Sequence, residues 1–229
     1  MSEESAAEPR AWQERAVSRS LERSRVHAER RSAQFIETAL QLVEETGGED
    51  FTVQDVVDRM KVSTRTFYQF FAGKDEFLLA IFEEGQRERN HRLRQVVDAE
   101  PDPLARLRVF VIGSQQGTQR SATSRFMVQH YFRLLVSHPA ELRQSYKGVI
   151  AYLAGLIADA AASGAIRSTD HHRTAGFILQ TMNTAIQANI LDWPLMDPPP
   201  SPEEVWEFCL RGIAAGPANA EWSGGSATP

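Results

Sequence analysis

The stretch from Phe51 to Phe82 constrains the fold most strongly, because its apolar residues and helix-starting residues have the spacing of short helices. Thr52, with Asp55 three residues later, has the spacing of a capping box and marks a helix start. Ser63 is a favourable N-cap for a second helix, predicted over residues 64–71. An apolar run with helical spacing follows. The stretch therefore predicts two short helices joined by a tight turn, and then a long helix.

The second short helix is predicted to expose polar side chains along one face. Phe67 and Phe71 lie one turn apart and must pack on the preceding helix, which leaves the positions beside them facing outward. Arginine suits the O6 and N7 edge of guanine, glutamine suits adenine, and threonine suits the thymine methyl group. Tyr68, Lys74 and the helix-starting Thr52 are placed to contact flanking phosphates. The outward residues are Thr64, Arg65, Tyr68 and Gln69.

The charge pattern of this stretch differs from that of the whole chain. Arg59, Lys61, Arg65 and Lys74 lie close together with no acidic residue among them, whereas the chain has a formal net charge of −5. Because the chain as a whole is acidic, binding to a polyanion must come from a local patch. A cationic patch on a helix-turn-helix pattern is what reading a DNA major groove requires.

Helical spacing also dominates the rest of the chain, and no segment has the alternation of a strand. Gly47, Pro139 and Gly164 supply helix ends, and Ser201 to Glu204 form a capping box with proline at the first helical position. We therefore predict an all-α fold of about nine helices. The helices outside the stretch above are predicted at about residues 31–46, 74–97, 103–120, 124–137, 140–163, 170–191 and 201–214.

A set of short motifs occurs in order along the first third of the chain: Ala39-Leu40, Gly47, Phe51-Thr52-Val53, Val62-Ser63, Thr66-Phe67-Tyr68, Phe71 and Lys74. With them, the segment from about His27 to Glu88 resembles the DNA-binding domain of the tetracycline-repressor (TetR) family of transcriptional regulators. The resemblance implies an N-terminal three-helix helix-turn-helix domain and a C-terminal helical domain for effector binding and dimerisation. The DNA-binding residues are predicted to be Thr52, Ser63, Thr64, Arg65, Thr66, Tyr68, Gln69 and Lys74.

The predicted division of the chain follows from this resemblance. Residues 1–27 form an Arg/Glu-rich extension, residues 28–88 the helix-turn-helix domain, residues 89–215 the effector-binding and dimerisation domain, and residues 216–229 a flexible tail.

Two positions depart from the family pattern. Met60-Lys61 stands where the family usually has a small residue and then glycine. A lysine in a left-handed turn costs on the order of 1 kcal/mol, so we expect a strained turn there. Phe70 stands where the family often has histidine or tyrosine, and we expect it to pack rather than to contact a phosphate.

The second half of the chain allows both functions that the resemblance implies for it. The candidate ligand-binding residues either line a pocket or simply form core. Apolar stripes in the last two helices face either a second copy of the chain or their own subunit, and periodicity does not decide. The candidate ligand-binding residues are Phe110, Gln116, Phe126, Met127, His130, Tyr131, Phe177, Met182 and Asn183. The stripes are Ile178, Met182, Ala185, Ile186 and Asn189, then Val205, Phe208 and Cys209.

Several other functions find no support in the sequence. The single cysteine, Cys209, excludes an internal disulfide, fits a reducing cytoplasm and lies in an apolar run that predicts burial. The adjacent His171 and His172 diverge by about 100° on a helix and make poor metal co-ligands. No apolar run reaches the ~18 residues of a membrane span. No nucleophile motif or phosphate loop points to an enzyme or to a cofactor.

The N-terminal arm allows two interpretations. From Arg10 to Gln34 there are seven basic residues against three acidic ones, 7 − 3 = +4. Such an arm either adds minor-groove or phosphate contacts or is a solvated tail.

Together these features predict a cytoplasmic homodimer that binds a two-fold operator and is released by a small, largely apolar effector. Two copies are expected because one short recognition helix supplies too little affinity by itself. The alternative is a helical ligand-binding or scaffolding protein that has lost DNA binding.

Overall fold

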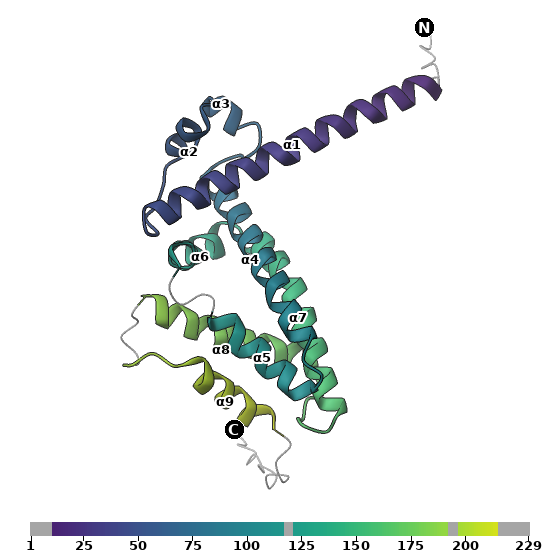
Figure 1. The fold of residues 1–229 in the computed structure, drawn as a ribbon, viewed down its shortest axis with the longest axis vertical. Helices are drawn as coiled ribbons and strands as arrows, with labels where there is room; N and C mark the ends of the chain where they lie inside the picture. The colour runs from purple at the N-terminus through teal and green to yellow at the C-terminus, as the bar shows by residue number, and fades with distance from the viewer. Residues whose placement is uncertain (1–10, 117–120, 192–196, 215–229) are drawn as a thin grey trace, which may run out of the picture.

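The computed structural model describes residues 11–116, 121–191 and 197–214, and these ranges fold into helices, as the all-α prediction requires (Figure 1). Apart from them, one isolated bridge joins Ile166 and Ala214. None of the described helices is long and apolar enough to cross a bilayer. The helices are α1 (Ala11–Glu45), α2 (Val53–Met60), α3 (Thr64–Phe67), α4 (Lys74–Asp98), α5 (Pro103–Gln116), α6 (Ala122–Ser137), α7 (Pro139–Ala162), α8 (His171–Leu191) and α9 (Pro202–Ile213).

An aromatic core holds α1, α2, α3 and the beginning of α4 together. The ring of Phe67 lies 5.6 Å from that of Phe35 on α1 and 5.1 Å from that of Phe77 on α4, both edge to face. All three side chains are fully buried. Such ring pairs add to the hydrophobic stabilisation of burial, so they fix the short α3 on its neighbours.

The same core extends into the second half of the chain through α6. Phe126 stacks on Phe51 at 5.4 Å, and both Phe126 and Leu134 are fully buried within this cluster. Residues 28–88 therefore do not close their core alone, and the predicted boundary near residue 88 remains a prediction.

A second core joins the end of α4 to α5, α7, α8 and α9. Leu107, Leu153 and Met182 lie at its centre and are almost completely buried. α2 and α3 lie at one end of the molecule and α9 at the other, with α4 running between them (Figure 1). Because α4 begins in the first core and ends in the second, it connects the two parts rigidly.

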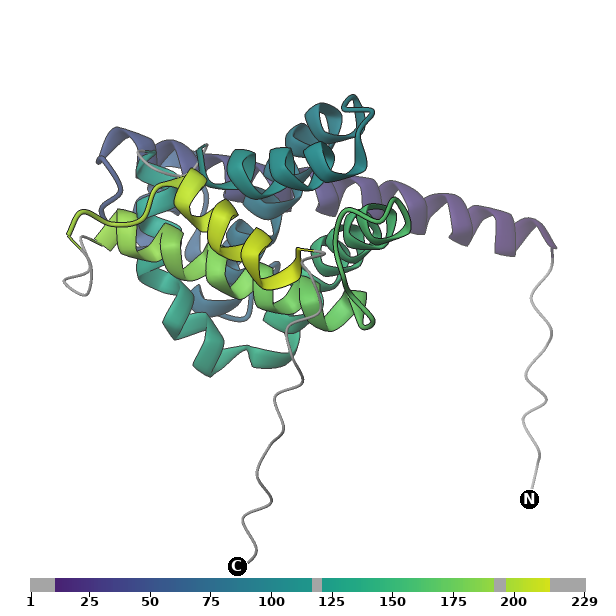
Figure 2. The ribbon, with the colours of Figure 1, turned by 90° about the horizontal axis from the view of Figure 1, so that it is seen from below.

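The first helix is much longer than predicted. It begins at Ala11 rather than near Arg31, and its N-terminal half extends away from the rest of the molecule in both views (Figures 1 and 2). Arg25 pairs with Glu22 and Glu29, each at 2.9 Å. Such pairs one turn apart support an exposed helix, and the packed part of α1 already supplies the costly nucleus. A segment with few apolar residues can therefore still be helical.

Other helix ends also differ from prediction. α3 ends at Phe67 rather than near Phe71, because the chain tightens there into bonds between residues three apart, such as Phe70 N–H to Phe67 O at 2.9 Å. α6 begins at Ala122, two positions before the predicted Ser124. Residues 117–120, the predicted end of α5, and the predicted tail 216–229 lie outside the described residues.

Candidate nucleic-acid interface and cavity

Two N-caps set the directions of α2 and α3. The Thr52 hydroxyl accepts from the Asp55 backbone N–H, and the Asp55 carboxylate accepts from the Thr52 N–H at 2.7 Å. The Ser63 hydroxyl likewise accepts from the Thr66 N–H at 3.1 Å. The two predicted helix starts are confirmed, and they orient the short helices independently of any ligand.

The outward face of α3 carries the side chains predicted for it. Thr64, Arg65 and Gln69 are exposed, and the Tyr68 side chain has 57% of its surface open to solvent. Phe67 and Phe71 lie buried behind them, as the helical spacing requires. Thr66 is half-buried, and its hydroxyl lies 3.0 Å from that of Ser63, so Thr66 supports the cap. Which of these groups touches DNA remains a prediction.

The turn between α2 and α3 is left-handed at lysine. Lys61 has φ 54° and ψ 45° and is the only non-glycine residue with positive φ in the described ranges. The Lys61 N–H donates to Asp58 O, and the Val62 N–H donates to Val57 O, which is the bond pattern of a Schellman motif. The expected turn is thus present with its strained lysine. Phe70 packs on Phe35 at 5.8 Å, as predicted.

Half of the predicted cationic patch is already paired with acidic residues. Lys74 Nζ lies 2.8 and 2.9 Å from the two carboxylate oxygens of Asp50 and also donates to Phe51 O. Arg59 binds both oxygens of Glu45, at 3.0 and 2.6 Å. In the described part of the chain, no carboxylate forms an ion pair with Arg65 or Lys61. Fewer cations near α3 are therefore without an ion-pair partner than the sequence indicates.

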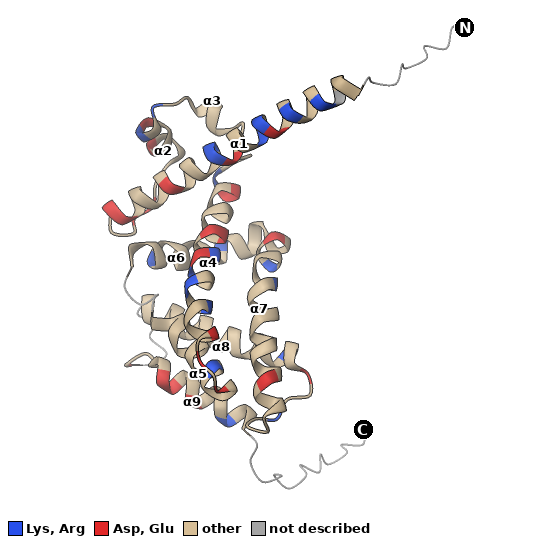
Figure 3. Cartoon of the chain, turned by 45° about the vertical axis from the view of Figure 1, so that its right-hand side comes forward, with Lys and Arg blue, Asp and Glu red and all other residues tan. Residues whose placement is uncertain are grey.

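The extended half of α1 carries several arginines, which we call the arginine ridge, with acidic residues between them (Figure 3). Arg15, Arg19 and Arg23 are spaced four residues apart on the extended half of the helix, which places them on one face. Arg19 and Arg23 are exposed. Arg25 lies on a different face of α1, where its ion pairs with Glu22 and Glu29 neutralise its charge.

α6 connects the helix-turn-helix to the remainder of the chain. Thr123 donates its hydroxyl to a carboxylate oxygen of Glu44 on α1 at 2.6 Å. His130 Nε2 lies 3.4 Å from the Asp50 carboxylate, and its ring packs on Phe126 at 4.5 Å. Phe126 and His130, both predicted to bind the ligand, lie at this junction.

The titrating groups of the junction influence each other. Burial lowers the pKa of His130, and the charge of Asp50 opposes that shift. Burial acts to raise the pKa of Asp50, but the hydrogen bond and charge of Lys74 outweigh it and hold this pKa below its ordinary value. Near neutral pH His130 is therefore uncharged while Asp50 and Lys74 are an ion pair.

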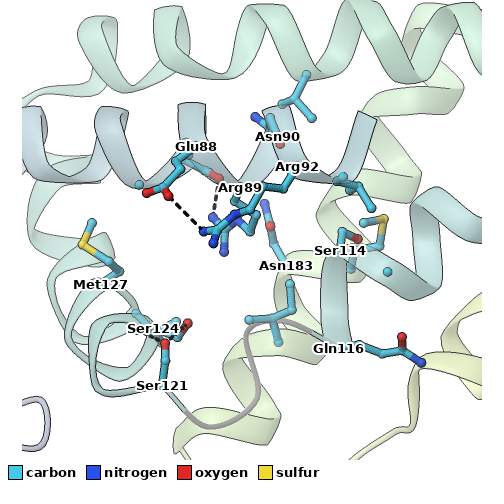
Figure 4. Close-up of a pocket in the computed structure, with 18 of the residues that line it drawn as sticks. Glu88, Arg89, Asn90, Arg92, Ser114, Gln116, Ser121, Ser124, Met127 and Asn183 are labelled. Carbon is cyan, nitrogen blue, oxygen red and sulfur yellow. Dashed lines mark hydrogen bonds and ion pairs between the residues drawn. The ribbon is translucent and has the colours of Figure 1, made fainter. Parts of the chain in front are cut away.

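A cavity of about 1040 Å³ lies between α4, α5, α6 and α8 (Figure 4). Its size is that of sites for small organic molecules. Six of the predicted ligand-binding residues line it, whereas Phe126, His130 and Phe177 do not. The Phe177 side chain is 64% exposed, and the Arg173 guanidinium lies over its ring at 5.5 Å. The six lining residues are Phe110, Gln116, Met127, Tyr131, Met182 and Asn183.

Several polar residues of the cavity were not among the predicted ligand-binding residues. Arg89 and Asn90 on α4, Ser114 on α5 and Tyr146 on α7 also line it. Tyr146 hydrogen-bonds with the predicted Tyr131 and Asn183, and burial strongly raises the pKa of its phenol. The charged residues around Arg89 have the composition of a solvent-exposed helix face. The place of Arg89 in the cavity follows from how the helices pack, so the spacing of apolar residues in the sequence does not predict it.

Most of the predicted dimer stripe faces its own subunit. Ile178, Met182 and Ala185 on α8, with Val205 and Cys209 on α9, are buried in the second core. Burial raises the pKa of the Cys209 thiol to about 11, which fits its predicted role as a small hydrophobe. Phe208 is 69% exposed, so the apolar surface available to a second copy includes Phe208 and Phe177.

No group of three or more histidine, cysteine, aspartate or glutamate side chains in the described ranges has the arrangement of a metal site. His171 is bonded to the backbone of its own loop, with its Nε2 3.1 Å from Ser168 O.

Comparisons with known proteins bear on both parts of the chain. A family model described as bacterial regulatory proteins, tetR family, matches residues 35–81, which span the end of α1 to the beginning of α4. No curated protein matches the sequence.

Solved structures share the fold over most of its length, at identities that show the fold alone. A TetR-family transcriptional regulator from Pectobacterium atrosepticum has a TM-score of 0.69 and 18% identity, covering 84% of this chain and 98% of that one. The fatty acid degradation regulator FadR from Bacillus halodurans has a TM-score of 0.63 and 18% identity, over 79% and 98%. FadR from Bacillus subtilis, in complex with stearoyl-CoA, has a TM-score of 0.57 and 18% identity, over 79% and 98%.

Proposed function

We propose that this chain, a DNA-binding transcriptional regulator of the TetR family, is a cytoplasmic repressor that a small organic effector releases from its operator. Regulators of this family are not enzymes. One observation carries the proposal: α3 and the turn after it present Arg65, Tyr68 and Gln69 outward, with Phe67 and Phe71 buried behind them, on a capped helix-turn-helix. A rigid, solvent-facing set of base-reading groups is what direct readout in a major groove needs.

Direct readout assigns separate roles to the exposed groups. Arg65 pairs with the O6 and N7 edge of a guanine, and Gln69 with an adenine. Thr64 contacts a neighbouring base, and Tyr68 contacts a flanking phosphate. Thr52 and Ser63 begin their helices, where the backbone N–H groups favour an anion. Lys74 positions the loop before α2 in the free protein, because its ammonium group contacts Asp50 there, and its phosphate contact stays a prediction.

The cavity provides the place for the effector. It is lined by α4, α5, α6 and α8, and α4 also carries Phe77 in the aromatic core of the helix-turn-helix. An effector that binds more tightly when α4 is in one position than in another shifts α4 towards that position. This shift changes the distance between the two copies of α3 in a dimer, here called the reading heads. α6 participates in this coupling, since it lines the cavity through Met127 and contacts the Asp50 loop through His130.

A homodimer supplies the two reading heads. The exposed Phe177 on α8 and Phe208 on α9 place large apolar side chains on the outer surface of the second core. Burying them between two copies of the chain removes apolar area from water, and a two-fold axis repeats the same contact.

A binding experiment on the chain's own upstream DNA tests the proposal. Fluorescence anisotropy should show saturable binding to one two-fold segment, with competitor DNA of other sequence displacing it poorly. Equal binding to all sequences, or none, would reject repression and favour a helical ligand-binding or scaffolding protein. The double change Phe177→Ser and Phe208→Ser should yield monomers in sedimentation and weaken operator binding without unfolding the protein.

A further inference from the structure

Arg89 places a positive charge inside the cavity. Its side chain extends from α4 into the cavity, towards the side of α8 that carries Asn183 (Figure 4). The Arg89 side chain is partly buried, and this burial lowers its pKa. An arginine nevertheless stays protonated in proteins, so this charge has to be balanced by other means.

Among the described residues, no carboxylate forms an ion pair with Arg89. The hydrogen-bond partner of Arg89 is the neutral side-chain oxygen of Gln86. The nearest carboxylate in sequence, Glu88, forms its ion pair with Arg92 instead, at 3.6 Å. Glu44, which also lines the cavity, is bonded to Thr123. A partly buried charge without an ion-pair partner in the protein is a favourable binding site for a ligand of opposite charge.

The surroundings of Arg89 combine a polar cluster with apolar walls. Tyr146 lies near the guanidinium, and it hydrogen-bonds with Tyr131 and Asn183. The phenol and amide groups can therefore orient an anion that Arg89 binds. Apolar side chains occupy other parts of the wall, among them Phe110, Met127, Leu179 and Met182.

We propose that the effector is an organic carboxylate, with its anionic group bound by Arg89 beside Tyr146 and its apolar body held along Met127 and Met182. This inference rests on the proposed function, because it names the chemical class that the cavity recognises. A carboxylate matches the two parallel donors of a guanidinium.

Direct calorimetric titration without DNA tests the inference on the full chain. The probes are matched pairs that differ in charge and little else: decanoate with decanamide, and naphthoate with naphthamide. The wild-type protein should bind at least one carboxylate about tenfold or more tightly than its amide, since a charge-assisted hydrogen bond contributes about 1.5–3 kcal/mol. Because this comparison uses only the wild-type protein, its outcome does not depend on whether a substituted protein folds.

Variants then assign the preference to Arg89. Arg89→Gln should bind the carboxylate and the amide equally, and Arg89→Lys should keep part of the preference because it keeps the charge without the two-pronged geometry. Arg87→Gln is the matched control, since Arg87 lies on the same helix, is exposed and paired with Glu84, and does not line the cavity; it should keep the full preference. An amide that binds as well as its carboxylate, failure of every carboxylate to bind, or a preference retained in Arg89→Gln would overturn the inference.

Operator binding is measured separately, so the two proposals fail in different ways. A chain that binds carboxylates through Arg89 but binds no DNA contradicts the repressor and leaves the cavity assignment standing. A chain that binds its operator and is released only by uncharged compounds supports the repressor and contradicts the carboxylate.

Discussion

Lys74 Nζ lies 2.8 Å from Asp50 Oδ1, so the first residue of α4 is tied to the loop that precedes α2. The same carboxylate oxygen faces His130 of α6 at 3.4 Å. One aspartate thus joins three segments that are far apart in the sequence. Lys74 is thereby a positioning group in the free protein, although its place in the sequence predicts a phosphate contact.

Removing either end of this ion pair should weaken operator binding in the same way. Lys74→Ala and Asp50→Ala are expected to lower affinity by similar factors, because both loosen the loop before α2. The slope of log affinity against log salt should not change, since the protein still neutralises the same phosphates. A slope reduced by about 0.9 in Lys74→Ala alone would instead show that Lys74 binds a phosphate. Arg143→Ala, an exposed change on α7, is the control.

Arg65 should carry sequence preference rather than general affinity. Arg65→Ala is expected to cost about 1–3 kcal/mol on the operator and to relax the preference at one base pair. Affinities for a set of operators, each with one base pair replaced, measure this directly. Equal losses on every operator in the set would mean that Arg65 touches only the backbone, and Gln69→Ala should relax a different position.

The left-handed Lys61 predicts a stabilising substitution. Lys61→Gly should raise the free energy of unfolding by up to about 1 kcal/mol, because glycine adopts φ 54° without the steric penalty of a Cβ atom. Lys61→Ala keeps that atom and should give no such gain. Urea denaturation of the three proteins provides the comparison, and equal stability of the glycine and alanine variants would show that the turn is unstrained.

The partly buried His130 predicts a pH dependence of stability. Its pKa is lower in the folded protein than in the unfolded chain, so the unfolded chain binds more protons as the pH falls through about 6.5. The wild-type protein should therefore lose stability relative to His130→Gln between about pH 7 and pH 5. Melting temperatures across this range measure the difference, and a constant difference would contradict the shift. Replacement of the exposed His172 is the control.

The arginine ridge of α1 should bind DNA phosphates beyond the recognition helix. Replacing Arg15, Arg19 and Arg23 by glutamine is expected to lower operator affinity and to reduce the salt slope by about 0.9 for each phosphate that is no longer neutralised. Arg25→Gln should have little effect, because Glu22 and Glu29 already neutralise Arg25. Deleting residues 1–25 should reproduce the effect of the triple change, and unchanged affinity and slope would make the arm a solvated helix.

Local signals in the sequence predicted the helix-turn-helix well. The caps at Thr52 and Ser63, the inward Phe67 and the left-handed Lys61 each depend on neighbours within a few residues. Such short-range interactions leave a recognisable spacing, which is why the family resemblance also falls on this part of the chain.

Interactions between residues far apart in the chain produce no recognisable spacing in the sequence. The pairing of Lys74 with Asp50 joins residues 24 positions apart, and that of Arg59 with Glu45 joins residues 14 apart. Both ion pairs neutralise cations that the composition alone would assign to the DNA-binding surface. Phe126 and Phe177 likewise have suitable chemistry for a ligand site, but packing directs one into the aromatic core and the other to solvent.

The amino-acid sequence by itself determined which segments are helical, the caps of α2 and α3, and the outward face beside Phe67, because hydrogen bonds and side-chain spacing within one or two turns decide those features. Only the tertiary structure decided which charges remain free, that α6 shares the core of the helix-turn-helix, and that Arg89 lines a cavity and forms no ion pair with a carboxylate among the residues described. Those outcomes depend on which helices meet, and each is the result of desolvation and contact between residues distant in the chain.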